Sequence, residues 1–305
     1  MPLPLSTLVL GTEGYVLEDS ASCEARLDAW FDGGGNAVDS ARGYGNGESE
    51  RVIGNWIARR DIRHEFMVLT KGCHPDGMTR RVTKEHLAED LAGSLEALGT
   101  DCIDLYFLHR DDPSVPAGEI VEWLNEHKAA GAVRVLGASN WARQRVVEAN
   151  TYAEENGLSG FVATSNYAGL AVANEPMWWE CVQMDGDYRQ WQIETQTPNF
   201  CWSSLAHGFF SGRYSPEDEA NGDQTHKDIV RTFYDEENWR RLHRAAEAQH
   251  WRDMSAVQIA CAYVISLPYP SFAVAWAANV EELEELFEAA EVKLSVDELE
   301  WLESG

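Results

Sequence analysis

Residues Asn36 to Gly45 read NAVDSARGYG, and this stretch decides how the chain is interpreted. Its short apolar start stops at Asp39, and Tyr44 follows five residues later. Two further apolar runs stop in the same way at one ionisable residue, the first at Lys71 and the second at His109. Three strands that each end in a titratable side chain predict a parallel barrel that presents these groups at one rim, where βα-loops build active sites.

Strand-like and helix-like segments alternate along the chain, which is typical of repeated βα units. The predicted fold is therefore α/β, a single (β/α)8 TIM barrel over residues 1–305, with long rim loops at the C-terminal face over residues 168–194 and 203–226. Strands are expected at residues 8–10, 37–39, 67–70, 103–108, 133–137, 161–164, 198–202 and 272–275. Helices are expected at residues 48–60, 84–98 with Thr83 as N-cap, 117–130, 142–155 and 280–289.

Composition predicts a soluble protein of the cytoplasm. Hydrophobic residues make up 44% of the 305 residues, enough for a sizeable core. No run of about 18 apolar residues is present, so a membrane span is not expected. The first six residues lack the basic start and long apolar stretch of a secretory signal.

Charge and cysteine content exclude several kinds of partner. With 51 acidic against 24 basic residues, the formal net charge is −27, a field that repels nucleic acid and anionic lipid. Six cysteines are scattered without a Cys-x-x-Cys pair, which argues against a metal site or a disulfide framework. A small molecule is the expected partner, and no feature of the sequence selects an oligomeric state.

The four ionisable residues together have the chemistry of a general acid. A phenol with an ordinary pKa of about 10 is a reluctant proton donor. The ammonium of Lys71 would lower the pKa of Tyr44, and Asp39 would hold Lys71 charged. His109 would steer a substrate oxygen by a hydrogen bond. Taken singly, each residue also has an ordinary explanation: a strand cap, a loop aromatic, a surface charge or a core histidine.

In these motifs the chain resembles the aldo-keto reductase family. The likeness continues through residues 137–141, GASNW, and 202–212, WSSLAHGFFSG, and covers nearly the whole chain. It implies that Asp39, Tyr44, Lys71 and His109 are catalytic. The implied function is nicotinamide-dependent interconversion of a carbonyl, an aldehyde, a ketone or a sugar, and its alcohol. Two alternatives stay open: a catalytically weak redox sensor or regulatory subunit that binds the cofactor, and a barrel that performs acid–base chemistry on sugars.

No Gly-x-Gly-x-x-Gly fingerprint is present, so a Rossmann-type dinucleotide site is not expected. The resemblance implies instead that the cofactor, NADP or NAD, binds at the barrel rim. The implied contacts are Gly11, Thr12, Asp39, Ser139, Asn140, Thr164, Ser165, Trp202, Ser203, Leu205, Gly208, Ser211 and Arg213. Thr164 or Ser165 would replace a glutamine usual in the family. Ala278 stands where the family usually carries a cation for the 2′-phosphate, and glutamates follow it. Reduced discrimination against NAD is therefore expected.

The substrate side is less specific. Glu13, Arg110, Asp111 and Trp141 are the candidate pocket residues, and carboxylates, an arginine and an indole together suit a polyhydroxylated ligand. Equally, Asp111 and Asp112 form a turn ahead of Pro113.

Overall fold

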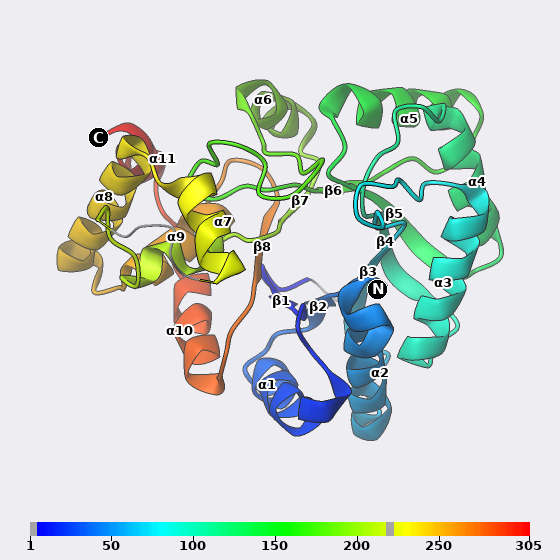
Figure 1. Ribbon diagram of the computed structural model, residues 1–305, viewed down its shortest axis with the longest axis horizontal. Helices are drawn as coiled ribbons and strands as arrows, with labels where there is room; N and C mark the ends of the chain where they lie inside the picture. Colours follow the sequence, from blue (N-terminus) through cyan, green and yellow to red (C-terminus); the bar gives the residue numbers. More distant parts are fainter. Residues whose placement is uncertain (1–4, 218–222) are drawn as a thin grey trace. The chain divides into compact units, whose positions relative to one another are not determined.

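Eight parallel strands form a closed barrel in chain order in the computed structural model, which describes residues 5–217 and 223–305 (Figure 1). The predicted (β/α)8 fold is thus confirmed. Residues 1–4, which belong to the segment considered for a secretory signal, lie outside the described residues. Residues 218–222 of the second expected rim loop also lie outside them. The strands are β1 (Leu8–Gly11), β2 (Ala37–Asp39), β3 (Met67–Gly72), β4 (Ile103–Leu108), β5 (Val133–Ser139), β6 (Ala163–Ser165), β7 (Asn199–Cys201) and β8 (Ser271–Ala275).

The helices match the predicted ranges closely where the sequence is amphipathic. They are α1 (Ser20–Asp32), α2 (Glu48–Arg60), α3 (Lys84–Leu98), α4 (Ala117–Ala129), α5 (Arg143–Glu155), α6 (Gly186–Thr195), α7 (Gln224–Phe233), α8 (Glu236–Arg252), α9 (Ala256–Ile265), α10 (Val280–Ala290) and α11 (Val296–Ser304). Three short 3-10 helices are η1 (Leu17–Asp19), η2 (Tyr44–Gly47) and η3 (Ala206–Ser211). Both expected rim loops contain helix, since α6 lies in the first, and η3 and the start of α7 lie in the second.

Local signals explain the boundaries of the two best-predicted helices. The Thr83 hydroxyl accepts a hydrogen bond from the His86 amide at the start of α3, as an N-cap should. Gly99 ends that helix with φ 62°. Helix α2 has acidic residues in its first turn and basic residues in its last, which suits the helix dipole.

The chain divides into two compact units, and the first comprises Met1–Ser165 and Trp276–Val280. Within it, β1 to β6 pair in sequence, and helices α1 to α5 pack each against the next (Figure 1). Gly54 permits the close approach of α2 to α3, because a Cβ there would lie 2.6 Å from the Ala97 carbonyl oxygen. Close packing of this kind fixes the strand ends that carry the predicted catalytic residues.

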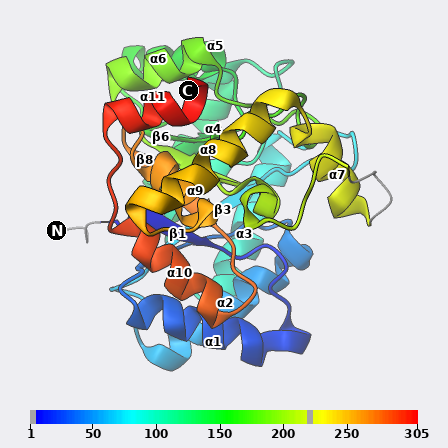
Figure 2. The ribbon, with the colours of Figure 1, turned by 90° about the vertical axis from the view of Figure 1, so that its left-hand side faces the viewer.

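The second unit comprises Asn166–Ala275 and Glu281–Gly305. Helix α8 lies beside both α9 and α11 (Figure 2), and every residue of α9 except the half-buried Val257 is buried. A helix that is apolar on all sides lacks the amphipathic period of a surface helix, so the sequence pattern assigned no element there. The prediction of a single domain over residues 1–305 stays a prediction.

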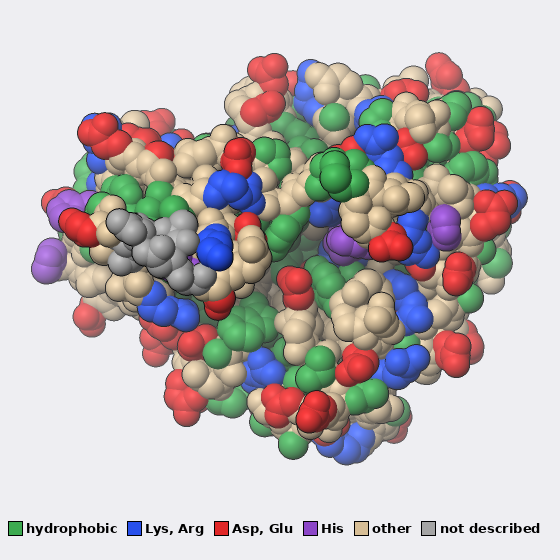
Figure 3. All heavy atoms as spheres, viewed as in Figure 1, with side chains coloured by type: hydrophobic (Ala, Val, Ile, Leu, Met, Phe, Trp, Pro, Cys, Tyr) green, Lys and Arg blue, Asp and Glu red, His purple; other side chains and the backbone are tan. Residues whose placement is uncertain are grey.

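Acidic side chains dominate the charged surface, as the space-filling view of one face shows (Figure 3). Across residues 5–217 and 223–305, the helices are all too short or too polar to span a lipid bilayer.

Candidate active site

The first unit brings together Asp39 from the end of β2 and Lys71 from β3. The Lys71 ammonium donates hydrogen bonds to Asp39 Oδ2 at 2.5 Å and to the Ser40 carbonyl at 2.9 Å. The two side chains are only 2% and 4% exposed. Burial raises the pKa of the Asp39 carboxyl, and the Lys71 ammonium opposes that rise. The ion pair therefore fixes a cation inside the barrel rim.

Tyr44, the first residue of η2, lies beside this cation. The Lys71 ammonium is 5.4 Å from the centre of the Tyr44 ring, and the His109 ring is 5.9 Å away in an edge-on arrangement. The Tyr44 amide donates to the Ala41 carbonyl, which closes a turn between β2 and η2. All four residues of the predicted tetrad thus lie together in the first unit.

His109, which follows β4, is neutral in this environment. Burial lowers its pKa well below the ordinary value, and the charges of Arg110 and Lys71 and the nearby His74 lower it further. Its Nδ1 is buried and makes no hydrogen bond. A neutral imidazole keeps one N–H, so His109 retains the means to donate one hydrogen bond to a substrate oxygen.

His74 is a further residue of the site that the sequence interpretation missed. Its ring packs edge-on against His109 with 4.6 Å between ring centres, while part of the side chain reaches solvent. His74 Nδ1 donates to the Pro75 carbonyl at 2.8 Å, since a carbonyl only accepts, and Nε2 is then an acceptor. Burial lowers the pKa of His74 as well. Its position three residues beyond Lys71, on the loop after β3, was the available signal.

The residues expected to hold the nicotinamide carboxamide meet at the ends of β5 and β6. Ser139 Oγ donates to the Ser165 carbonyl at 2.9 Å, and Asn140 Nδ2 donates to Ser139 Oγ at 3.0 Å. Asn140 has φ 58°, a left-handed conformation that asparagine tolerates better than most residues. The Thr164 side chain is fully buried. Ser165 Oγ is buried too, and among the described residues it has no hydrogen-bond partner. An unsatisfied hydroxyl beside Ser139 and Asn140 fits a ligand amide.

Residues after β1 play different parts. Gly11 pairs with Asp39 in the sheet register. Thr12 is fully buried, and its hydroxyl donates to the Asp39 carbonyl and accepts from Ser49. Glu13 reaches solvent, and the protein around it raises the pKa of its carboxyl while the charge of Lys71 lowers it. Thr12 therefore braces the strand ends, and Glu13 is the member of this trio whose side chain is exposed.

Two of the four proposed substrate residues, Asp111 and Trp141, contact Arg145 in a largely buried cluster. Asp111 binds Arg145 through both carboxylate oxygens, at 2.8 and 3.1 Å. The same guanidinium lies 5.3 Å from the centre of the Trp141 ring, which is fully buried. Asp112 accepts from the amide and hydroxyl of Ser114, as in a turn. This geometry favours the turn interpretation of residues 111 and 112.

Arg110 is buried too, at 4% exposed. Its guanidinium donates to the carbonyl of His109 at 2.7 Å. The His109 carbonyl also accepts from Asn140 Nδ2 at 3.3 Å. Arg110 thus links His109 to the residues at the end of β5.

In the second unit, Trp202 begins the loop expected to carry the cofactor phosphates. Its ring packs against Trp178 and Tyr167, with ring centres 5.6 and 5.3 Å apart, and its buried Nε1 has no hydrogen-bond partner. Ser203 and His207 hydrogen-bond to each other at 2.7 Å. Both have positive φ, as does Ala206 between them. Left-handed conformations at residues other than glycine are costly, and such strain gathers at ligand sites.

The end of this loop forms a cationic cradle. Gly208 has φ 82°, and a Cβ at this position would lie 3.2 Å from the Arg213 guanidinium. Ser211 Oγ accepts from Arg213 Nε at 3.1 Å. Leu205, half-buried, accepts from the Gly208 amide. Backbone amides, a hydroxyl and a guanidinium around a glycine fit a phosphate group.

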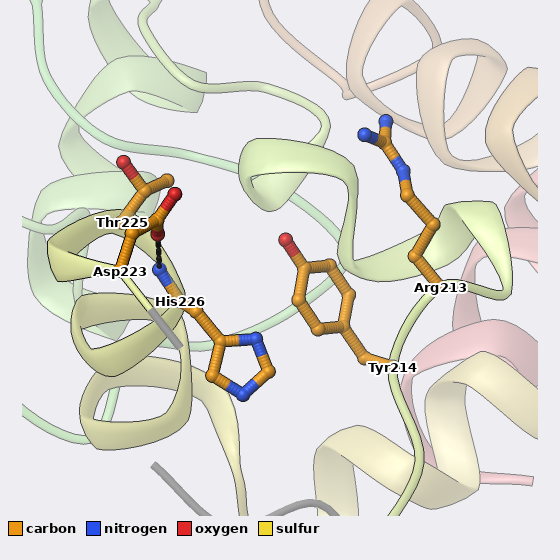
Figure 4. Close-up of a pocket in the computed structure, with 5 residues that line it drawn as sticks. All are labelled: Arg213, Tyr214, Asp223, Thr225 and His226. Carbon is orange, nitrogen blue, oxygen red and sulfur yellow. Dashed lines mark hydrogen bonds between the residues drawn. The ribbon is translucent and has the colours of Figure 1, made fainter. Parts of the chain in front are cut away.

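Arg213 also borders a pocket of about 520 Å³ in the second unit. Figure 4 shows Arg213 and Tyr214 on one side and the start of α7 on the other, where Asp223 accepts from the His226 amide. The Tyr214 and His226 rings face each other with centres 5.6 Å apart. Asp223 adds a carboxylate, so the part of the pocket beside Arg213 is the part suited to an anion.

Known proteins resemble this chain over nearly its whole length. The model of the aldo/keto reductase family matches residues 7–304. Norsolorinic acid reductase of Aspergillus flavus is 30% identical over 314 residues, which cover 98% of this chain and 76% of that protein. A thermostable aldo-keto reductase solved with an inhibitor has a TM-score of 0.75 at 21% identity, covering 98% and 95% of the two chains. An aldo-keto reductase of Klebsiella pneumoniae, solved with NADPH, has a TM-score of 0.70 at 22% identity, covering 98% and 90%.

Proposed function

This chain belongs to the aldo/keto reductase family and is an NAD(P)-dependent oxidoreductase, and from that premise we propose that Tyr44 is its general acid and base. The substrate is an aldehyde or ketone, or the corresponding alcohol in the reverse direction. The observation that carries the proposal is the position of Tyr44, between the buried Lys71 ammonium and the neutral ring of His109.

Each residue has a defined part in carbonyl reduction. The bound nicotinamide supplies a hydride to the carbonyl carbon. Tyr44 gives its phenolic proton to the carbonyl oxygen as negative charge develops there. Lys71 stabilises the phenolate that remains, and Asp39 keeps Lys71 in place. His109 donates its one N–H to the same oxygen and so orients the carbonyl.

The cofactor contacts follow from the same resemblance. Ser139, Asn140 and Ser165 hold the carboxamide, because they present donors and acceptors to a group that needs both. In the second unit, Trp202 would offer an aromatic face to a nicotinamide ring, and the Gly208–Arg213 cradle would bind phosphate. The Klebsiella relative holds NADPH. Ala278 nevertheless offers no cation to a 2′-phosphate, so both NADP and NAD are accepted.

The proposed substrate is a small carbonyl compound that carries hydroxyl groups, as a sugar does. Asp111 and Trp141 are committed to Arg145, so hydroxyl recognition at the cleft mouth falls to Glu13 and His74. Carboxylate and imidazole acceptors at this mouth favour a substrate that carries hydroxyl donors.

The test follows the absorbance of reduced cofactor with matched panels of aldoses, ketoses, aryl aldehydes and quinones. Tyr44→Phe should lower turnover by about 10²–10⁴-fold, the usual contribution of general acid catalysis. Cofactor affinity, measured by quenching of tryptophan fluorescence, should be unchanged because the ring remains. Tyr152→Phe, on the exposed face of α5, is the matched control.

Near-normal turnover by Tyr44→Phe would refute the assignment of the acid. Tight cofactor binding by the wild-type protein without turnover of any carbonyl would instead favour a redox sensor.

A further inference from the structure

Arg42 closes a ring of contacts between the segment that carries Tyr44 and the strand that carries Lys71. The Arg42 amide donates to the Lys71 carbonyl at 2.8 Å. Its guanidinium lies 3.6 Å from Glu50 Oε2. Glu50 Oε1 accepts from the Thr70 hydroxyl at 2.7 Å, and Thr70 immediately precedes Lys71 on β3. The Arg42 backbone therefore contacts β3 directly at Lys71, and the Arg42 side chain is linked to β3 through Glu50 and Thr70.

The side chain of Arg42 reaches Glu50 through a space left by two glycines. A Cβ at Gly47 would lie 1.7 Å from Arg42 Nη1, and a Cβ at Gly93 would lie 2.6 Å from Arg42 Nε. Gly47 precedes α2, and Gly93 lies within α3. The guanidinium is thus confined between two helices, which restricts it to one path.

The end of this path is a buried carboxylate. Glu50 is fully buried, and burial raises the pKa of its carboxyl, while hydrogen bonds from the Ser94 and Thr70 hydroxyls and the charge of Arg42 lower it. Arg42 is the cation beside this carboxylate, at 3.6 Å from its Oε2. A buried carboxylate with one cation near it strongly favours keeping that cation in place.

Arg42 also restrains the residues that follow Tyr44. Its Nη1 donates to the Asn46 carbonyl at 3.5 Å. Gly45, Asn46 and Gly47 all have positive φ, at 55°, 51° and 83°. Three successive left-handed residues form this turn, and Asn46 is the one among them that carries a Cβ. Arg42 is bonded on both sides of Tyr44, through its own amide before it and through Asn46 after it.

We propose that Arg42, anchored on Glu50, is a positioning residue that holds Tyr44 at its working distance from Lys71. The proposal rests on the proposed function in one respect, the role of Tyr44 as the acid. Lys71 from β3 and His109 from the end of β4 lie beside Tyr44, and Asp39 acts on it through Lys71. Arg42 touches none of the reacting atoms and acts by fixing the backbone.

Two variants disturb this anchor in different ways. Arg42→Gln removes the charge and the reach to Glu50. Gly93→Ala leaves Arg42 intact and displaces its guanidinium by adding a methyl group 2.6 Å from Nε. Alanine also has the higher helix propensity, so a loss of activity in Gly93→Ala is not explained by a weaker α3. Arg42→Lys keeps the charge, and Arg59→Gln, on an exposed ion pair with Glu24, is the control.

Turnover should fall about ten- to hundredfold in both Arg42→Gln and Gly93→Ala, since displacements near 1 Å have effects of that size. Arg42→Lys should lie between Arg42→Gln and wild type, and Arg59→Gln should equal wild type. Cofactor affinity should stay within about twofold in all four, because the anchor does not touch the cofactor residues. Turnover within about twofold of wild type in both Arg42→Gln and Gly93→Ala would overturn the proposal.

A second readout needs no activity. The absorbance of tyrosinate is measured against pH for the wild-type protein and for Tyr44→Phe, and the difference between the two curves is the titration of Tyr44. The same subtraction is made for Arg42→Gln and the double variant Arg42→Gln/Tyr44→Phe. Arg42→Gln should move that titration to higher pH, because Tyr44 shifts away from the Lys71 charge. An unmoved titration would overturn the proposal even if the wild-type protein reduced no carbonyl. Absence of carbonyl turnover together with a moved titration would refute the proposed function alone.

Discussion

Removing the carboxylate of Asp39 tests the energetic basis of the site. In Asp39→Asn the buried Lys71 ammonium, 2% exposed in the wild-type protein, loses the carboxylate to which it is bonded and keeps the Ser40 carbonyl. Leaving one member of a buried ion pair uncompensated typically destabilises a protein by about 3–5 kcal/mol. For 305 residues the unfolding entropy is about 0.64 kcal/mol/K at the usual value per residue. The expected fall in Tm is therefore about 5–8 °C.

Scanning calorimetry on three variants measures this fall. Glu24→Gln breaks an exposed pair with Arg59, whose usual worth is about 0–1 kcal/mol, and should change Tm by less than about 2 °C. The double variant Asp39→Asn/Lys71→Met should melt above Asp39→Asn, because it removes the stranded charge. If Asp39→Asn melts with the wild-type protein, or the double variant melts lowest, the buried ion pair does not have the role assigned to it.

Three further outcomes are expected. The free energy of unfolding of wild type should fall relative to His109→Asn as pH drops from about 7 to 5. The reason is that His109 binds a proton in the unfolded chain but not when it is buried in the folded protein. The free energy of unfolding should then change by at most about 1.4 kcal/mol per pH unit. If urea unfolding gives the same pH dependence for wild type and His109→Asn, this reasoning is wrong. Raising NaCl from about 0.1 to 1 M should raise Tm, since it shortens the screening length from about 10 to 3 Å for a chain of net charge −27. A Tm that falls with salt would contradict that account. Titration of tryptophan fluorescence should show NADPH preferred over NADH by less than about a hundredfold, because a missing charged contact forfeits about 1.5–3 kcal/mol. A larger preference would place the 2′-phosphate on a cation other than one near Ala278.

The sequence predicted those parts of the molecule that local pattern determines. Helix α2 was predicted with its observed bounds because its apolar residues recur at helical spacing between acidic and basic ends. Asp39 and Lys71 were predicted to meet because parallel strands bring their carboxyl ends to one rim. The structure places them 2.5 Å apart.

Contacts between distant residues were beyond such patterns. Asp111 resembled a substrate group until the structure showed Arg145, 34 residues away, bound to both of its oxygens. Helix α9 has no polar face, so its sequence does not distinguish a buried helix from a buried strand. The path of Arg42 past Gly93 likewise depends on how α2 and α3 pack.

The path of the Arg42 side chain past Gly93 couples the residue types that positions 42 and 93 can carry. Gly47 adopts a left-handed conformation and suits glycine whatever its neighbours are. Gly93 lies in the interior of α3, where alanine would ordinarily be favoured, and its lack of a side chain is explained by the arginine that crosses it. A side chain at 93 would force the Arg42 guanidinium off its present path, so this path and glycine at 93 are expected to occur together. Related sequences should accordingly substitute positions 42 and 93 as a pair.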